Sequence, residues 1–140
     1  MKKFLFAALV TLFITSSSFA EGGRINNTIK NNFSYDFKGV SEVEWSTTAS
    51  YATASFILNN KRTNAFYDND GQLIGTIQAI SIDEMPASAK RSFAKKYADY
   101  TVVESINFTT ATESTYFISA KKDENKVVLK VSNGFLSVVK

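Results

Sequence analysis

The stretch Met85–Val103, MPASAKRSFAKKYADYTVV, decides the fold. Proline holds φ near the helical value, so Pro86 suits the first position of a helix. Ala89, Phe93 and Tyr97 then recur every fourth residue, which places them on one face of that helix. The last residues of the stretch are rich in β-branched side chains. The stretch therefore predicts an amphipathic helix that leads into a strand.

The same plan occurs earlier in the chain. An apolar stripe is followed by Gly39, which can end a helix in the left-handed conformation, and then by a β-rich segment. The stripe consists of Ile25, Ile29, Phe33 and Phe37. A constant offset aligns Phe33 with Phe93, Phe37 with Tyr97, Val43 with Val103 and Glu44 with Glu104. We therefore predict a tandem repeat, with repeat one at about 25–80 and repeat two at about 85–140.

Each predicted helix is followed by about four segments that alternate as strands do, separated by Asn-, Asp- and Gly-rich turns. The first helix runs to about Lys38 and is capped by Asn26 or Asn27. The expected strands are Val40–Trp45, Tyr51–Leu58, Thr63–Tyr67, Leu73–Ile80, Tyr100–Thr109, Thr115–Lys121, Lys126–Val131 and Phe135–Val139. The predicted class is α+β, with one antiparallel sheet and two helices on one face.

The N-terminus resembles a signal peptide. Lys2 and Lys3 precede an apolar core, Phe4–Thr15, which is too short for a comfortable membrane span. Small residues at Ser18 and Ala20 predict cleavage after Ala20. We expect residues 1–20 to be removed, which leaves a single domain at 21–140 in the periplasm or outside the cell. The alternative is a retained N-terminal anchor.

The charge of the chain belongs largely to this leader. The sequence has 16 Lys plus Arg and 13 Asp plus Glu, a net charge of +3. Loss of Lys2 and Lys3 leaves 14 against 13, a net charge of +1. A nearly neutral domain has no long-range field for nucleic acid or an anionic membrane, so we expect neither as a partner.

Several short motifs together resemble the PepSY-like, beta-lactamase-inhibitor-like (BLIP-like) domains of exported bacterial proteins, typical of the Bacteroidetes. They are Val43-Glu44-Trp45, then Tyr51, Ala52, Ala54 and Phe56, then Tyr67-Asp68-x-Asp70-Gly71-x-Leu73-Ile74-Gly75, Met85-Pro86 and Lys96-Tyr97. One departure is Met85, where Leu is usual. The resemblance implies a tandem α/β repeat on one antiparallel sheet and an exported location. It implies no established activity.

The sequence contains no His and no Cys, which excludes histidine acid/base catalysis, Cys nucleophiles and ordinary zinc or haem sites. Ser92–Lys95 and Ser119–Lys122 match the Ser-x-x-Lys pattern of penicillin-recognising enzymes, but the partner motifs are missing. We therefore interpret these serines as ordinary helix and strand positions. We expect no catalytic residues, no cofactor and no metal, so the protein is predicted not to be an enzyme.

Three groups of charged residues each have a structural as well as a functional interpretation. Asp68-Asn69-Asp70-Gly71 lacks the spacing of a calcium loop, which favours a hairpin turn, with weak cation binding as the alternative. Glu42 and Glu44 are predicted to share one strand face, as a solvated surface rather than an acid/base pair. Six basic residues form either a basic patch or a solvated helix face, and we favour the solvated face. They are Lys90, Arg91, Lys95, Lys96, Lys121 and Lys122.

The remaining candidate is a binding surface. A sheet with helices on one face leaves its other face open, and aromatic side chains there would suit protein contacts. The candidate residues are Trp45, Tyr51, Ile57, Tyr67 and Tyr116, with packing in the core as the alternative for each. We predict a non-catalytic exported module that binds a protein partner through the open face, in an inhibitor-like manner. The alternative is a carrier or sensor of a small or apolar ligand.

Overall fold

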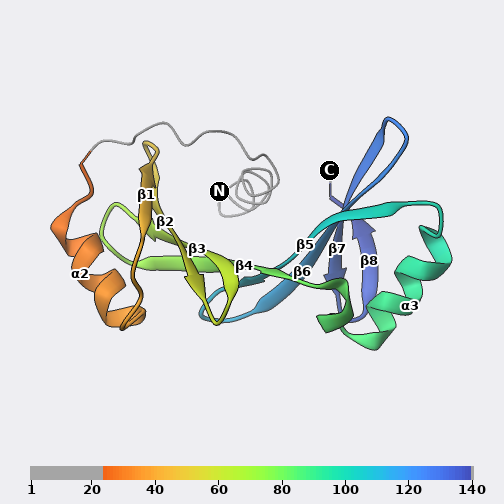
Figure 1. Ribbon diagram of the computed structural model, residues 1–140, viewed down its shortest axis with the longest axis horizontal. Coiled ribbons are helices and arrows are strands. Elements are labelled where there is room, and N and C mark those ends of the chain that lie inside the picture. The colour runs from red at the N-terminus through yellow and green to blue at the C-terminus, as the bar shows by residue number, and fades with distance from the viewer. Residues whose placement is uncertain (1–23, 140) are drawn as a thin grey trace. The chain divides into compact units, whose positions relative to one another are not determined.

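The computed structural model describes residues 24–139, which form two α-helices, one short 3₁₀ helix and eight strands (Figure 1). The predicted signal peptide and its cleavage site after Ala20 lie outside the described residues. The elements are α2 (Asn27–Asp36), β1 (Glu44–Thr47), β2 (Tyr51–Leu58), β3 (Lys61–Asp68), β4 (Leu73–Ile80), η1 (Ile82–Glu84), α3 (Ala87–Lys96), β5 (Thr101–Thr109), β6 (Ser114–Lys122), β7 (Asn125–Ser132) and β8 (Phe135–Val138).

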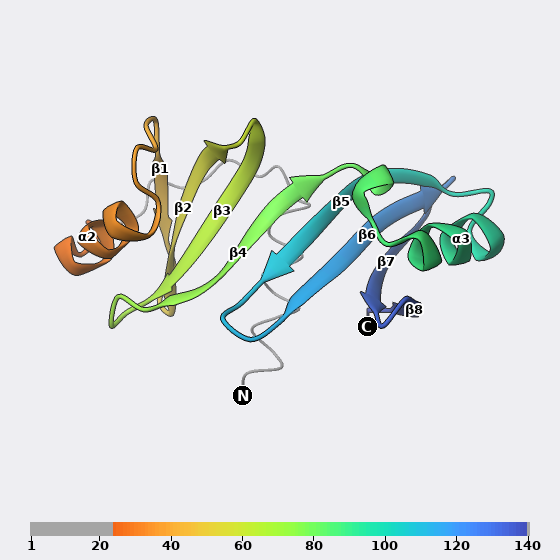
Figure 2. The ribbon, with the colours of Figure 1, turned by 90° about the horizontal axis from the view of Figure 1, so that it is seen from below.

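The eight strands form one open antiparallel sheet in which spatial order follows chain order, from β1 to β8 (Figure 2). This confirms the predicted α+β class. The chain divides into two compact units. We call the described residues 24–79 and 107–114 the N-terminal unit, and residues 80–106 and 115–139 the C-terminal unit. The tandem duplication and the placement of both helices on one face stay predictions.

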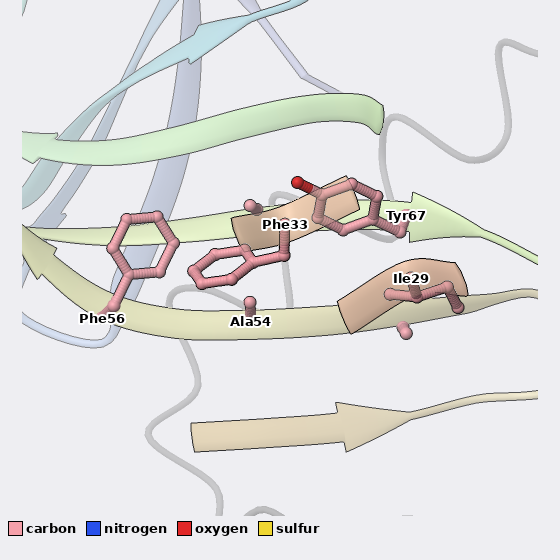
Figure 3. Close-up of a cluster of buried hydrophobic side chains, with 7 residues drawn as sticks. Ile29, Phe33, Ala54, Phe56 and Tyr67 are labelled. Atoms are coloured by element: carbon pink, nitrogen blue, oxygen red, sulfur yellow. The ribbon is translucent and has the colours of Figure 1, made fainter. Parts of the chain in front are cut away.

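In the N-terminal unit, α2 packs its apolar stripe on β2 and β3. Ile29 and Phe33 are buried against Ala52, Ala54, Phe56, Ala65 and Tyr67 (Figure 3). The alanines leave room for the large rings, and the Phe33 ring lies 5.1 Å from Phe56 and 6.4 Å from Tyr67. Asn26 caps the helix, because its Oδ1 accepts a hydrogen bond of 2.8 Å from the Thr28 amide.

In the C-terminal unit, α3 packs on β6 and β7 with a mainly aliphatic core. Ala89 and Phe93 are buried with Met85, Ile118, Ala120, Leu129 and Val131. Phe33 and Phe93 are 5% and 8% exposed, which confirms that both predicted stripes face the core. The helix begins after Pro86 without a side-chain cap. The Ser81–Glu84 capping box, which could not start a helix containing Pro86, instead caps the separate η1.

The main departure from the predicted elements concerns the first strand, which starts at Glu44 instead of Val40. Glu42 has a φ of 58°, and Gly39 has a φ of 80°. Left-handed residues interrupt an extended backbone, because they turn the chain between α2 and the edge of the sheet. The prediction that Glu42 and Glu44 share one strand face was therefore wrong. The first helix also ends at Asp36, two residues before Lys38.

Candidate protein-binding surface of the N-terminal unit

The β2–β3 hairpin has two faces, and α2 covers one of them. One face carries the alanines and aromatic rings that pack under α2. Successive side chains of a strand point to opposite faces, so the remaining residues of each strand lie on the other face. We call this other side, within the N-terminal unit, the open face. On β2 it carries Tyr51, Thr53, Ser55 and Ile57.

The strand register extends the open face onto the neighbouring strands. Directly paired residues of antiparallel strands share a face. Thr53 pairs with Phe66, Ser55 with Asn64 and Ile57 with Arg62, so these β3 residues belong to the open face. On the outer side Glu44 pairs with Ser55, and on the inner side Phe66 pairs with Gly75 and Asn64 with Ile77.

One part of the open face is apolar and buried. The Tyr51 and Phe66 rings meet edge to face, with centroids 5.9 Å apart. A Cβ at Gly75 would lie 3.1 Å from Cζ of Phe108, so the missing side chain leaves room for that ring. Phe66, Ile77 and Phe108 are at most 2% exposed. Burial of Tyr51 disfavours its charged form and raises the pKa of its hydroxyl.

The other part of the open face is accessible. Ile57 is 61% exposed, more than the other exposed strand aliphatics Leu73, Val103 and Val138. Arg62 lies directly opposite it on β3 and is also exposed. Glu44 is exposed on β1, one strand away. Ile57 is thus an exposed aliphatic side chain with charged side chains on the two neighbouring strands, as at the apolar centre and polar rim of an interface.

The structure places the five predicted surface residues in different environments. Tyr51 and Ile57 lie on the open face, but Tyr51 is buried at 8% exposure, so of these two only Ile57 is accessible to a partner. Trp45 pairs with Ala54 and packs edge to face on Phe33 at 5.2 Å, so it belongs to the core under α2. Tyr116 packs against the core under α3 in the C-terminal unit. The predicted surface is therefore corrected at these two positions.

Tyr67 is also corrected, because it is fully buried on the α2 side, opposite Ala52. Its hydroxyl donates a hydrogen bond of 2.8 Å to Oδ2 of Asp36, at the end of α2. Burial, and then the hydrogen bond to the carboxylate and its charge, raise the pKa of Tyr67 far above its ordinary value of 10.0. Tyr67 therefore anchors the helix to the sheet and is not a contact residue.

Phe66 and Arg62 also belong to the open face, but this was not predicted from the sequence. The position of the β2–β3 turn could have revealed it. Asn59 and Asn60, with φ values of 52° and 62°, form a two-residue turn that places Leu58 opposite Lys61. Counting outward from that pair assigns every β3 residue to a face.

The two Ser-x-x-Lys matches lie in different secondary structure. Ser92 and Lys95 lie on α3, where Lys95 is exposed. Ser119 and Lys122 lie three positions apart on β6, so their side chains point to opposite faces. Lys122 Nζ instead forms an ion pair of 3.0 Å with Oδ2 of Asp99. Ser119 is therefore not beside its lysine, and the helical Ser92–Lys95 pair lacks the partner motifs of the penicillin-recognising enzymes.

The Asp68–Gly71 segment forms the predicted hairpin turn. Asp68 Oδ1 accepts hydrogen bonds from the amides of Asp70 at 3.0 Å and Gln72 at 2.9 Å, and Gly71 has a φ of 87°. These contacts account for the acidic residue as a turn former. Within residues 24–139, no three acidic side chains gather in a group that could hold a metal ion.

The predicted basic group divides between two sides of the C-terminal unit. Lys121 neighbours Ala120 on β6, and Ala120 packs under α3. Lys121 therefore points away from the face that α3 covers, while Lys90, Arg91, Lys95 and Lys96 belong to α3 itself. This favours separate solvated surfaces over one patch. Among residues 24–139, neither helix is long and apolar enough to cross a membrane.

No protein-family model and no curated protein sequence matches this chain. Solved structures from Bacteroides do match its fold. A DUF2874 family protein from Bacteroides ovatus is 21% identical with a TM-score of 0.75, over 82% of this chain and 86% of that one. A predicted periplasmic protein from Bacteroides eggerthii is 18% identical with a TM-score of 0.77, over 81% and 86%. A BLIP-like protein from Bacteroides fragilis is 16% identical with a TM-score of 0.72, over 84% and 89%.

These similarities confirm the predicted BLIP-like fold. At such sequence identity they define the class of fold and leave the activity of this chain open. The predicted relationship to PepSY-like domains remains a prediction.

Proposed function

We propose that the protein is a non-catalytic, exported module that binds a protein partner through the open face of its N-terminal unit. The observation that carries the proposal is Ile57, which is 61% exposed, lies opposite the exposed Arg62 and shares a strand face with the buried Tyr51 and Phe66. Apolar anchors surrounded by charged groups are typical of protein interfaces. Inhibitor-like action is the form of binding that the fold of the BLIP-like neighbour suggests.

The non-catalytic part of the proposal is supported by the residues available for chemistry. The chain has no His and no Cys. Ser119 points away from Lys122, the Ser92–Lys95 pair lacks the partner motifs of an enzyme, and Asp68 is engaged in a turn. Glu42 has a left-handed backbone outside β1, so it does not join Glu44 on a strand face. None of these groups has the paired arrangement that general acid/base or nucleophilic catalysis needs.

Packing under the helices argues against the alternative of an apolar-ligand carrier. Beneath α2, the Phe33 ring lies within 5.1–6.4 Å of four other aromatic rings, those of Phe37, Trp45, Phe56 and Tyr67. Beneath α3, Phe93 packs among buried aliphatic side chains and stacks on Tyr97 at 5.8 Å. A carrier needs a cavity of about 300 Å³ or more for its ligand, and rings in contact fill that space.

Export is supported by the signal-peptide pattern of residues 1–20 and by the predicted periplasmic neighbour from Bacteroides eggerthii. We expect the mature protein to begin at Glu21 and to meet its partner in the periplasm or outside the cell. N-terminal sequencing of the exported protein tests this expectation, and an intact N-terminus at Met1 would contradict it.

Affinity capture with matched variants tests the binding proposal. Ile57→Asp places a charge in the accessible part of the open face, and Tyr35→Asp places the same charge on α2, where Tyr35 is 75% exposed. Both positions are solvent-accessible, so both variants should fold. After crosslinking in the periplasm, we expect a partner recovered with the parent and with Tyr35→Asp to fall at least about tenfold with Ile57→Asp, since a charge in an interface core is costly. Equal recovery with all three proteins would contradict the proposed face.

A further inference from the structure

The outer edge of β8, in the C-terminal unit, presents outward-directed backbone groups in a defined pattern. Within residues 24–139, β8 ends the strand order and pairs only with β7. The Val139 amide donates to the Val128 carbonyl at 2.8 Å. Bonded and non-bonded pairs alternate along an antiparallel ladder, so Ser137 and Phe135 also bond toward β7. Leu136 and Val138 therefore direct their N–H and C=O groups outward.

The composition of this edge is unusual for a protected strand. Phe135–Val138 reads Phe-Leu-Ser-Val, with no charge and no proline. Exposed edge strands normally carry charged residues or proline, because these prevent pairing with another chain. β1, at the other end of the strand order, carries the exposed Glu44. On β8, Phe135 is 76% and Val138 is 52% exposed, so the edge offers apolar area as well as hydrogen-bonding groups.

We propose that β8 is the interface between two copies of this chain, which join edge to edge as antiparallel strands about a twofold axis. Such an axis stands perpendicular to the sheet, so residues that pair across it must lie on the same face. Leu136 and Val138 both lie on the α3 side, because their β7 partners Val131 and Leu129 pack under α3. We place the twofold axis between the Ser137 residues of the two copies. Leu136 of each copy then lies opposite Val138 of the other.

This edge is complementary to itself. The two Leu136–Val138 pairs exchange the outward N–H and C=O groups, which satisfies four groups on each copy. They also place aliphatic side chains opposite each other, which stabilises a strand pair. The self-paired Ser137 is exposed and uncharged, so no like charges meet at the axis. The interface uses the C-terminal unit and does not depend on the proposed partner-binding face.

Sedimentation of the mature protein, residues 21–140, tests the proposal in two arms. In the first, the mean mass should rise from one copy to two across a concentration series that reaches about 1 mM, where weak dimers form. Val138→Pro removes an outward N–H, which edge strands tolerate, and should keep the protein monomeric. Val138→Thr has a similar shape and keeps the N–H, so it should associate as the parent does.

In the second arm, Ser137→Lys and Ser137→Glu place like charges opposite each other at the axis. Each variant alone should be monomeric at low salt, whereas an equimolar mixture should form a dimer with one copy of each, because opposite charges then meet. The proposal is overturned by a parent protein that stays monomeric throughout the series. It is equally overturned if Val138→Pro associates like Val138→Thr, or if the mixture associates no more than either variant alone.

Discussion

The two units perform the same structural task with different side chains. In each, a ten-residue helix packs on the strands that follow it, and the helices lie at a constant offset of 60 residues, from 27 to 87 and from 36 to 96. The N-terminal core is built from aromatic rings, and the C-terminal core is mainly aliphatic. The difference teaches that the spacing of a helix stripe fixes where the helix packs, while the strands beneath it decide what fills the core.

The two helices also differ at their N-terminal ends. Asn26 caps α2 with its side chain, while α3 begins after Pro86 without such a bond. Both helices close with the same backbone bond, Phe37 to Phe33 at 2.9 Å and Tyr97 to Phe93 at 2.8 Å. α2 therefore depends on side chains at its start and in its core, which predicts larger effects of substitution in the N-terminal unit.

The largest effect is expected from the central phenylalanines. Phe33→Ala should lower the free energy of unfolding by about 4 kcal/mol and Phe93→Ala by about 3 kcal/mol, because Phe33 contacts more rings. Urea unfolding, followed by the fluorescence of Trp45, measures both. Leucine variants at the same positions keep the comparison available if an alanine variant does not fold. A larger loss at Phe93 would contradict the account of the two cores.

Next come three glycines with positive φ. A Cβ at Gly71 would lie 2.9 Å from Cγ2 of Thr28, and one at Gly134 would lie 2.5 Å from Oγ of Ser88, while nothing lies within 4 Å at Gly39. Alanine at Gly71 or Gly134 should cost about 2–3 kcal/mol, and at Gly39 about 1 kcal/mol from backbone strain alone.

A double variant sharpens the glycine comparison. Ser88→Ala removes the oxygen that a Cβ at Gly134 would meet, so it should recover part of the loss caused by Gly134→Ala. Ser88→Ala should recover nothing of the loss caused by Gly71→Ala, because a Cβ at Gly71 would meet Thr28 of α2 in the other unit. Thermal unfolding measures these differences, and equal recovery in both backgrounds would show that the contacts are not local.

A smaller effect is expected at Tyr67, and it depends on pH. Its folded pKa is raised above the unfolded value of 10.0, so its contribution is complete below about pH 10 and is lost as the pH rises further. Tyr67→Phe removes the hydrogen bond to Asp36 and should cost about 1 kcal/mol near pH 7. Above about pH 10 the variant should lose stability less steeply than the parent, since no buried phenol must ionise.

Urea unfolding at several pH values up to about 11 measures this slope. Asp36→Asn keeps an acceptor and removes the charge, so it separates the carboxylate from burial. We expect its slope to remain close to that of the parent, because burial is the larger cause of the raised pKa of Tyr67. A Tyr67→Phe variant with the parent slope would mean that another group governs alkaline unfolding.

Effects of similar or smaller size are expected at exposed polar contacts. Asn26→Ala should cost about 1 kcal/mol, because the start of α2 loses its side-chain cap. Asp99→Asn breaks the ion pair with Lys122, whose side chains are 74% and 43% exposed, and should cost less than about 0.5 kcal/mol. Thermal unfolding at low and high salt compares them, and a larger loss for Asp99→Asn would contradict this order.

Much of the fold could be predicted because local patterns determine it. Alternation gave Tyr51–Leu58 and Leu73–Ile80 with the observed bounds, and the fourfold stripe placed Phe33 and Phe93 in the core. The first strand was mispredicted because no local signal marks Glu42 as left-handed. The path from helix to sheet sets its backbone, and that path depends on tertiary packing.

The binding surface was harder to predict because exposure depends on register between strands. Tyr67 and Trp45 are large aromatics in strands, and composition alone cannot assign them to a face. The pairing of Tyr67 with Ala52 and of Trp45 with Ala54 places both under α2. Ile57 was placed correctly on the open face by alternation from Ala54 and Phe56, and its exposure follows from a face that α2 does not cover.

Photo-crosslinking at two adjacent residues tests the central claim most directly. Ile57 lies on the open face and Leu58 on the α2 side, so a photoreactive residue at each position samples opposite faces of one strand. In the periplasm, we expect position 57 to form a discrete adduct with another protein, of a mass different from twice that of this chain, and position 58 to form none. An adduct at position 58 alone, equal adducts at both, or none at position 57 would contradict a partner-binding open face.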